Sequence, residues 1–182
     1  MLSPFIVYDG NLLLERFPTN QVNRSLQAWD SADELLINHL NEQKLNSEQA
    51  RIVIFNDSFG ALSLNFTTQP CYMVSDSVIS QLGLKHNAEQ NHLPLDNLTL
   101  LTSLDDLPTN IDIVLYKVPK SGVLLREQLQ QLRKVINANT VFIAADKTKN
   151  IHNSTLALFE KYLGTTTTSL AIKKSRLIFC QV

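Results

Sequence analysis

Short runs of consecutive apolar residues, many of them β-branched, recur along this chain of 182 residues. Residues 51–57 (RIVIFND) and 111–116 (IDIVLY) are two of these runs, and neither alternates regularly between apolar and polar positions. A strand with apolar side chains on both sides is buried on both faces, which is typical of a parallel sheet covered by crossover helices. The chain is therefore predicted to fold around a mostly parallel sheet.

Segments with helical periodicity lie between the strand-like runs. In residues 121–136, an apolar side chain recurs every three to four positions, which predicts one buried helix face. Strands and helices thus alternate, which predicts right-handed crossover units and the α/β class. The expected strands are 51–57, 71–75, 98–102, 111–116 and 140–145, then a hairpin of 166–172 and 176–180, and the expected helices are 26–43, 76–91, 121–136 and 154–163.

The spacing of apolar residues also predicts which side of each helix is buried. The buried face of the first helix is expected to consist of Leu26, Trp29, Ala32, Leu36 and Leu40. The face expected for the second helix is Val78, Ile79, Leu82 and Ala88. The face expected for the third helix is Leu125, Leu129, Leu132 and Ile136.

Five alternating strands and a final hairpin match the strand count of the sheet of S-adenosylmethionine methyltransferases, in which the last strand inserts antiparallel. The predicted fold class is therefore α/β: a doubly wound, mostly parallel, Rossmann-like sheet of methyltransferase type with a terminal antiparallel hairpin. The length suits one domain, residues 1–182, in which about residues 1–45 form an N-terminal extension and a helix packed on the sheet.

The composition argues against several classes of protein. No apolar run approaches the ~18 residues of a membrane span, and residues 1–5 lack the basic start of a secretory signal. Cys71 and Cys180 are too few for a disulfide framework, and no histidine has a cysteine partner at metal-ligand spacing. We expect a cytoplasmic protein without a metal site or a membrane partner.

The turn after the first predicted sheet strand is where a methyltransferase of this class needs glycines, because its backbone approaches the cofactor in front of a helix N-terminus. Residues 56–62 (NDSFGAL) contain one glycine; Asp57 and Gly60 echo the pattern, but Phe59 is bulky. The loop therefore predicts a degenerate cofactor site. After the second strand, Asp76 is placed either to hold a ribose through its hydroxyls or to cap the next helix.

The end of the fourth strand is the second place where methyltransferase chemistry would be visible. Enzymes that methylate amino groups carry an Asn/Asp-Pro-Pro-aromatic tetrapeptide there, whose acceptors hold the target nitrogen. Residues 117–120 read Lys-Val-Pro-Lys instead. The cationic side chain of Lys117 cannot accept a hydrogen bond from the target, so no catalytic residue is predicted.

Charge is distributed very unevenly along the chain. Residues 1–116 carry 5 basic and 14 acidic side chains, a net charge of −9, whereas residues 117–182 carry 11 and 3, a net charge of +8. Such asymmetry favours binding to a polyanion or to an acidic partner, although basic residues can also be ordinary solubilising charge. The candidate RNA-binding residues are Lys117, Lys120, Arg126, Arg133, Lys134, Lys147, Lys149, Lys173, Lys174 and Arg176.

The position of these cations follows from the predicted sheet. Lys117, Lys120, Lys147 and Lys149 follow two parallel strands, so they are expected at the carboxyl edge of the sheet, where doubly wound folds bind ligands. For the cations of the terminal hairpin, the opposite edge of the sheet is one possibility. Cations of this kind suit contacts to phosphates without readout of bases.

Several segments together resemble one family: residues 14–18 (LERFP), 26–30 (LQAWD), 56–62 (NDSFGAL), 117–120 (KVPK) and the long stretch 151–178, which runs from IHNSTL to KKSRLI. In this order they resemble the N-terminal, non-catalytic domain of the bacterial 23S ribosomal RNA guanine-N2 methyltransferase G, over essentially all 182 residues. The small-subunit guanine-N2 methyltransferase C is similar more distantly.

The resemblance implies a tandem of two methyltransferase-like domains. The catalytic domain would follow residue 182 and bind S-adenosylmethionine, while this domain would bind no cofactor and help to recognise large-subunit ribosomal RNA beside its own catalytic domain. Two alternatives remain open at this point. The chain could be a protein-interaction or dimerisation module of that enzyme, or a small stand-alone S-adenosylmethionine methyltransferase.

Overall fold

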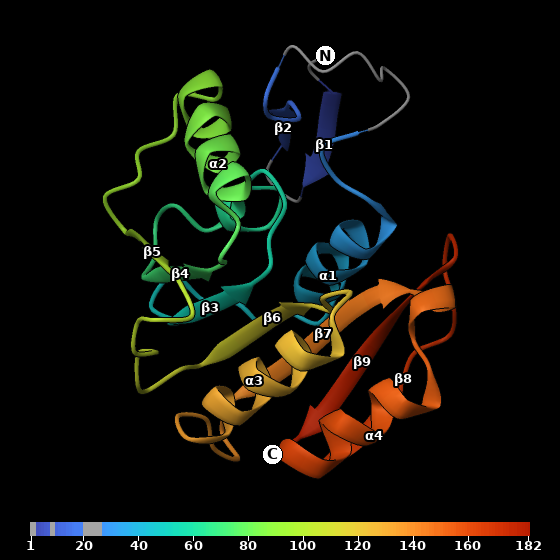
Figure 1. Ribbon diagram of the computed structural model, residues 1–182. Coiled ribbons are helices and arrows are strands. Elements are labelled where there is room, and N and C mark those ends of the chain that lie inside the picture. Colours follow the sequence, from blue (N-terminus) through green and yellow to red (C-terminus); the bar gives the residue numbers. More distant parts are fainter. Residues whose placement is uncertain (1–2, 8–9, 20–26) are drawn as a thin grey trace.

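A seven-stranded sheet forms the centre of the computed structural model, which describes residues 3–7, 10–19 and 27–182 (Figure 1). Its strand order is β5-β4-β3-β6-β7-β9-β8. The strands from β3 to β7 pair in parallel, and β9 inserts antiparallel between β7 and β8. The strand bounds are β3 Ile52–Phe55, β4 Cys71–Val74, β5 Leu98–Leu101, β6 Ile113–Lys117, β7 Val141–Lys147, β8 Thr165–Thr168 and β9 Ser175–Gln181.

Helices cover both faces of the sheet, as Figure 1 shows. The helix α1 (Ser31–Glu42) and α2 (Val78–Gln90) pack on one face, and α3 (Gly122–Arg133) and α4 (Asn153–Tyr162) pack on the other. Two short 3₁₀ helices, η1 (Ser63–Asn65) and η2 (Thr148–Asn150), follow β3 and β7. This is the predicted doubly wound α/β architecture with its antiparallel end. Within the described residues, no helix is long and apolar enough to cross a membrane.

Alternating side chains of the central strands divide the core into two layers. In β3, Ile52 and Ile54 face the α1–α2 layer, whereas Val53 and Phe55 face the α3–α4 layer. The central strands of the sheet therefore have no wet face, which explains why their sequences are apolar without alternation. The expected buried face of α3 is confirmed, with Leu125, Leu129, Leu132 and Ile136 all buried.

The helix α2 is rotated relative to the sequence-based prediction. Its buried residues are Gly83, Leu84, Asn87 and Ala88, whereas three of the four expected core residues, Val78, Ile79 and Leu82, are exposed. Gly83 lies against the Phe59 ring, where a Cβ atom would come within 2.6 Å of Cδ1. This close approach fixes which side of α2 faces the sheet, so only Ala88 was assigned correctly.

The N-terminal part differs from the prediction in two ways. The helix α1 begins at Ser31, with Asp30 as its N-cap, so the expected start at residue 26 is wrong; Leu26 itself lies outside the described residues. A hairpin of β1 (Ser3–Val7) and β2 (Gly10–Leu14), which the sequence analysis missed, forms a separate two-stranded sheet.

Two asparagines, one in α2 and one at its C-cap, attach this hairpin to the domain. The side chain of Asn91 accepts a hydrogen bond from the Leu13 N–H and donates one to the Leu13 carbonyl, both at 2.8 Å. Asn87 bonds the N–H and the carbonyl of Glu15 in the same way. These side chains therefore continue the hydrogen-bonding pattern of a strand partner.

The crossover from β5 to β6 contains no helix. Residues 102–112 form a loop instead, and its Leu107 and Ile111 pack on the α3–α4 layer of the core. A loop covers less of the sheet than a helix does, and a cavity remains beneath it, which is described below.

Candidate functional site

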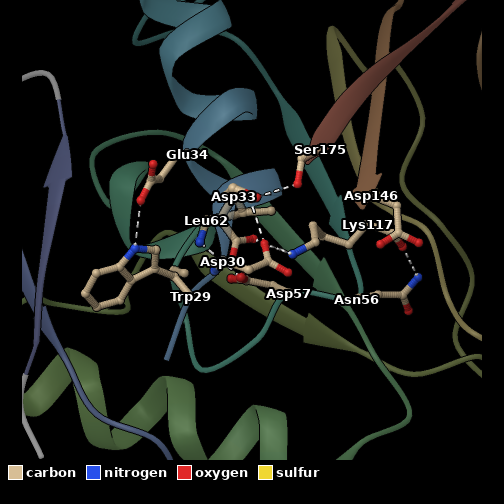
Figure 2. A network of polar contacts seen from close by, with 12 residues as sticks. Trp29, Asp30, Asp33, Glu34, Asn56, Asp57, Leu62, Lys117, Asp146 and Ser175 are labelled. Atoms are coloured by element: carbon tan, nitrogen blue, oxygen red, sulfur yellow. Dashed lines mark hydrogen bonds and ion pairs between the residues drawn. The ribbon is translucent and has the colours of Figure 1, made fainter. Parts of the chain in front are cut away.

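In the loop after β3, a buried side chain is bonded to backbone N–H groups of the same loop. The carboxylate of Asp57 is buried and accepts hydrogen bonds from the N–H groups of Leu62 (3.0 Å) and Ser63 (2.8 Å), at the start of η1 (Figure 2). In nucleotide-binding folds of this class, backbone N–H groups in this place bind an anionic ligand. Here the Asp57 side chain already occupies that position.

The left-handed backbone of this loop explains its single glycine. Gly60 has φ 87°, and a Cβ atom there would meet Leu64 Cδ1 at 2.9 Å. Phe59 also has a positive φ, 54°, and its ring is buried against α2. Gly60 therefore serves the turn and its packing on η1.

Lys117, at the end of β6, lies in a buried ionic network (Figure 2). Its Nζ atom donates to Asp33 Oδ1 at 2.8 Å and to Asp30 Oδ1 at 3.0 Å. Both aspartates belong to the start of α1, so the helix inserts its N-terminus at the carboxyl edge of the sheet. The predicted exposure of Lys117 to RNA is therefore wrong, because only 8% of the residue is exposed and its ammonium group is paired.

The charges in this network shift one another's pKa values. Burial raises the pKa of Asp33 to about 7; Lys117 acts against this, while Asp30 and Asp57 add to it. Burial also raises the pKa of Asp57. Burial alone would lower the pKa of Lys117, but Asp33 and Asp30 outweigh burial and hold it above its ordinary value. For Asp30, burial is again the largest single influence, but Lys117 and hydrogen bonds outweigh it and lower the pKa.

A second polar group fixes the other side of Lys117. Asn56 and Gln128 exchange two amide hydrogen bonds, at 2.9 and 3.0 Å, and Asn56 also donates to the Lys117 carbonyl at 2.8 Å. Tyr116 donates its hydroxyl to Gln128 Oε1 at 2.7 Å. These hydrogen bonds join the ends of β3 and β6 to Gln128 of α3.

Asp76 is exposed, and its side chain bonds to the loop after β5 rather than to the N-terminus of α2. Its Oδ1 atom accepts a hydrogen bond from the Ser103 N–H at 2.7 Å, and the N-cap of α2 is Ser77. The interpretation of Asp76 as a helix cap is therefore wrong. Asp76 also lines a cavity of about 200 Å³ under the β5–β6 loop, next to apolar side chains of Phe55, Val74 and Leu107.

The basic residues at the end of β7 and at the start of β9 form one cluster, which we name the basic corner. It consists of Lys147, Lys149, Lys173, Lys174 and Arg176, all exposed. In the pairing of β7 with β9, Lys147 lies opposite Ser175, and the Thr148 N–H donates to the Lys174 carbonyl at 2.8 Å. The hairpin cations are therefore at the carboxyl edge beside Lys147, and the possibility of the opposite edge is wrong.

The other candidate cations are more dispersed. Lys120 is exposed and lines a hollow of about 280 Å³ together with Asp146 and Asn150, next to the basic corner. Arg126 is exposed on α3, whereas Arg133 and Lys134 are exposed at the C-terminal end of that helix, toward the opposite edge. Among the residues that the structure describes, no three His, Cys, Asp or Glu side chains are grouped so that they could hold a metal ion.

Asp30 and Asp33 are neighbours of Lys117 that were not predicted from the sequence. They are 87 and 84 positions away in the chain. The local signal was their spacing: each side chain accepts the other's backbone N–H in a reciprocal cap of α1. That spacing predicts a cap but gives no information about a lysine at the end of a distant strand.

Comparison with protein families gives one match over almost the whole chain. The family described as "RLMG N-terminal domain" matches residues 3–182. The Ribosomal RNA large subunit methyltransferase G of Colwellia psychrerythraea is 59% identical over 186 residues, covering 100% of this chain and 47% of that protein. The protein of the same name from Vibrio vulnificus is 50% identical and covers 96% of this chain and 46% of its own length.

Solved structures share the fold at low sequence identity. The 16S rRNA N2 G1207 methyltransferase (RsmC) of T. thermophilus, solved with AdoMet and guanosine, is 18% identical with a TM-score of 0.70, over 100% of this chain and 50% of that one. The Precorrin-6y C5,15-methyltransferase of Geobacter metallireducens is 13% identical with a TM-score of 0.61, over 79% and 85% of the two chains. These likenesses establish the methyltransferase-type sheet.

The first prediction concerns the buried lysine. Replacing Lys117 by alanine leaves carboxylates buried without their cation, which typically costs about 3–5 kcal/mol of unfolding free energy. Urea denaturation followed by circular dichroism measures this loss. Lys120→Ala is the control, because Lys120 is exposed and such a change is expected to stay within about 0.5 kcal/mol. A loss below about 1 kcal/mol for Lys117→Ala would contradict the structural role of the network.

The second prediction concerns pH. Because the pKa of Asp33 is raised in the folded state to about 7, its contribution to stability is full below its unfolded pKa near 4 and is lost as the pH rises through 7. Asp33→Asn removes this titration, so unfolding free energy should fall less steeply between about pH 4.5 and 7.5. Asp57 leaves a residual slope of the same sign, since its pKa is also raised.

Urea melts of wild type and variant at several pH values measure this slope. Asp30→Asn is the matched control: the pKa of Asp30 is lowered, so its stability contribution is lost only as the pH falls through that lowered value. The slope of the Asp30 variant above pH 4.5 should keep the sign of the wild-type slope and be reduced less than in the Asp33 variant, because Asp30 supplies only part of the rise in the pKa of Asp33. An Asp33 variant with an unaltered slope would mean that Asp33 is ionised throughout this range.

Proposed function

The chain belongs to the family of RLMG N-terminal domains, and from this membership we propose that it is the RNA-recognition domain of a large-subunit ribosomal RNA methyltransferase. The parent enzyme would transfer a methyl group from S-adenosylmethionine to a guanine N2 atom of 23S ribosomal RNA in the cytoplasm. The names of the curated relatives support a methyltransferase of large-subunit ribosomal RNA, and the chain spans about half of their length. The catalytic groups and the cofactor would belong to the other half.

The observation that carries this proposal is the basic corner. Its five cations lie at the carboxyl edge of the sheet, and Lys120 stands across a hollow from η2. Ammonium and guanidinium groups in one cluster bind RNA through its phosphates, and contacts of this kind position RNA without reading its bases. The corner therefore suits a domain that holds RNA for a neighbouring active site.

The backbone of the hairpin supports the same function. Lys173 and Lys174 have φ values of 49° and 64°, and they form the two-residue turn between Ile172 and Ser175, which bond each other in both directions. Turns with two positive φ angles favour Asn-Gly, and a residue with a full side chain in this region costs of order 1 kcal/mol or more. The two lysines therefore lower the stability of this turn but place two cations at the tip of the hairpin.

The hydrogen bonds of the loop after β3 support the proposal that this chain has no catalytic activity of its own. A cofactor there would have to displace the buried Asp57 carboxylate from the N–H groups of Leu62 and Ser63. At the position where a methyltransferase offers acceptors to its target, Lys117 presents an ammonium group already bonded to two aspartates. We therefore propose that this chain has neither a cofactor nor a catalytic residue.

The third prediction tests whether the chain binds a cofactor. Calorimetric titration of the chain with S-adenosylmethionine should give no binding at micromolar concentrations, because the cofactor position is filled by Asp57. The full-length Colwellia relative, titrated with the same ligand stock, is the positive control. A dissociation constant near 10 μM, about −7 kcal/mol, would support a small stand-alone methyltransferase instead.

The fourth prediction tests RNA binding at the basic corner. The triple variant Lys147→Glu, Lys149→Glu, Lys174→Glu should bind RNA more weakly, and equally so for a large-subunit ribosomal RNA fragment and an unrelated RNA. Each lost phosphate contact on a single strand reduces the slope of log affinity against log salt by about 0.7, so the slope should shrink by roughly two. Fluorescence anisotropy at several salt concentrations measures both quantities.

A matched control separates the corner from general charge. The variant Lys44→Glu, Lys85→Glu, Lys161→Glu changes the net charge by the same amount at exposed positions elsewhere on the domain. It should retain most of the affinity and the wild-type salt slope. Equal losses in the two variants would mean that RNA responds only to net charge, and an unchanged affinity in the first would remove the corner from the RNA-binding surface.

A further inference from the structure

Four large apolar side chains are exposed at the β4–β5 end of the sheet, and we name them the α2 patch. Val78, Ile79 and Leu82, which lie on the first turns of α2, are 69%, 49% and 43% exposed. Leu104, in the loop after β5, is 94% exposed. Grouped apolar side chains of this size on a surface mark an interaction site more often than single ones do.

Hydrogen bonds hold the Leu104 loop next to the start of α2. The Ser103 N–H donates to Asp76, just before the helix, at 2.7 Å, and Gln81 reaches the Leu101 carbonyl at 3.3 Å. The cavity of about 200 Å³ opens beside Leu104, and Leu107 and Leu124 contribute to its lining. The patch thus combines projecting apolar side chains with an adjacent hollow that a partner's side chain can fill.

The charge around the α2 patch disfavours RNA as its partner. Residues 71–112, which form this end of the sheet, carry six acidic side chains and one basic side chain. Asp76, Asp105 and Glu127 line the cavity itself. Phosphates are repelled by such a surface, whereas an apolar centre with a polar rim is typical of contacts between proteins.

We propose that the α2 patch is covered by the half of the longer methyltransferase chain that this domain lacks. This rests on the proposed function for the existence of that half in the parent. The relatives from Colwellia and Vibrio carry roughly as much chain again as they share with this domain. A domain joined by a short flexible linker that spans the two sites has an effective concentration of about a millimolar, so a weak contact between the two halves is enough to populate the covered state.

Thiol labelling in a chimera tests this interface directly. In the Colwellia relative, the half that matches this chain is replaced by the chain itself, which is 59% identical. Leu82→Cys and Leu104→Cys are then labelled with a maleimide in the chimera and in the chain alone. The native Cys71 and Cys180 are buried and give a low background. Leu170→Cys, at a position 86% exposed in the hairpin loop, is the control.

We expect labelling at 82 and 104 to be slowed by about tenfold or more in the chimera, which corresponds to a patch covered most of the time, and labelling at 170 to be unchanged. Equal rates in both proteins would overturn the proposal. Slower labelling of the chain alone at higher chain concentration would assign the patch to a second copy, and slower labelling on adding RNA would assign it to RNA; either result overturns it.

A second format covers a chimera that does not fold. Cysteines are placed in the Colwellia relative at the positions that align with 82 and 104, and labelling of the full-length protein is compared with that of its matching half. Loss of RNA binding in the basic-corner variants is measured separately and at a different surface. The interface can therefore fail while RNA recognition stands, and RNA recognition can fail while the interface stands.

Discussion

The ion pairs of Lys117 join the start of α1 to the end of β6, two parts of the chain that are far apart in sequence. A lysine at the carboxyl edge of a buried strand is tolerated only when its charge is matched, and Asp30 and Asp33 match it at 3.0 and 2.8 Å. The two aspartates also cap α1 reciprocally, with Asp33 using its second oxygen for the cap. One cluster therefore fixes the beginning of α1, the end of β6 and, through the nearby Asp57, the loop after β3.

This arrangement places the chain's own charges where doubly wound folds bind their ligands. The backbone N–H groups of Leu62 and Ser63, at the start of η1, donate to Asp57, and Asp33, at the start of α1, accepts from Lys117 at the end of β6. The fold is retained because its stability depends on the apolar layers above and below the sheet. The binding properties of the carboxyl edge can change independently of the fold. Only a few polar residues there determine whether this edge binds a ligand or packs against a helix.

The sequence was informative about patterns that depend on neighbouring residues and poor for those that depend on distant ones. Local spacing of residues predicts three features: the α/β class with a mostly parallel sheet, the buried face of α3, and the poor fit of residues 56–62 to a glycine-rich loop. The face of α2 does not, because it is set by Gly83 against Phe59, 24 positions away in the chain. The role of Lys117 was also misjudged: a lysine after a strand looks like surface charge until α1, from the other end of the chain, packs over it.

The charge asymmetry of the sequence becomes an asymmetry in space because of the strand order. The sheet grows in opposite directions from β3: residues 71–101 form the strands on one side, and residues 113–181 form those on the other. The acidic segment with its α2 patch therefore lies at one end of the carboxyl edge, and the basic corner lies at the other.

The exception is α1, which belongs to the acidic half of the sequence but packs on β6, β7 and β9. Its acidic groups there are bonded to cations of the basic half, Asp33 to Lys117 and Glu34 to Lys173 at 3.2 Å. The helix thus neutralises part of the positive charge of the basic corner, at Lys173, and the other four cations of the corner are also exposed. Because this neutralisation is confined to the cations nearest α1, the domain keeps two chemically distinct surfaces on one rigid sheet edge, one suited to phosphates and the other to a protein partner.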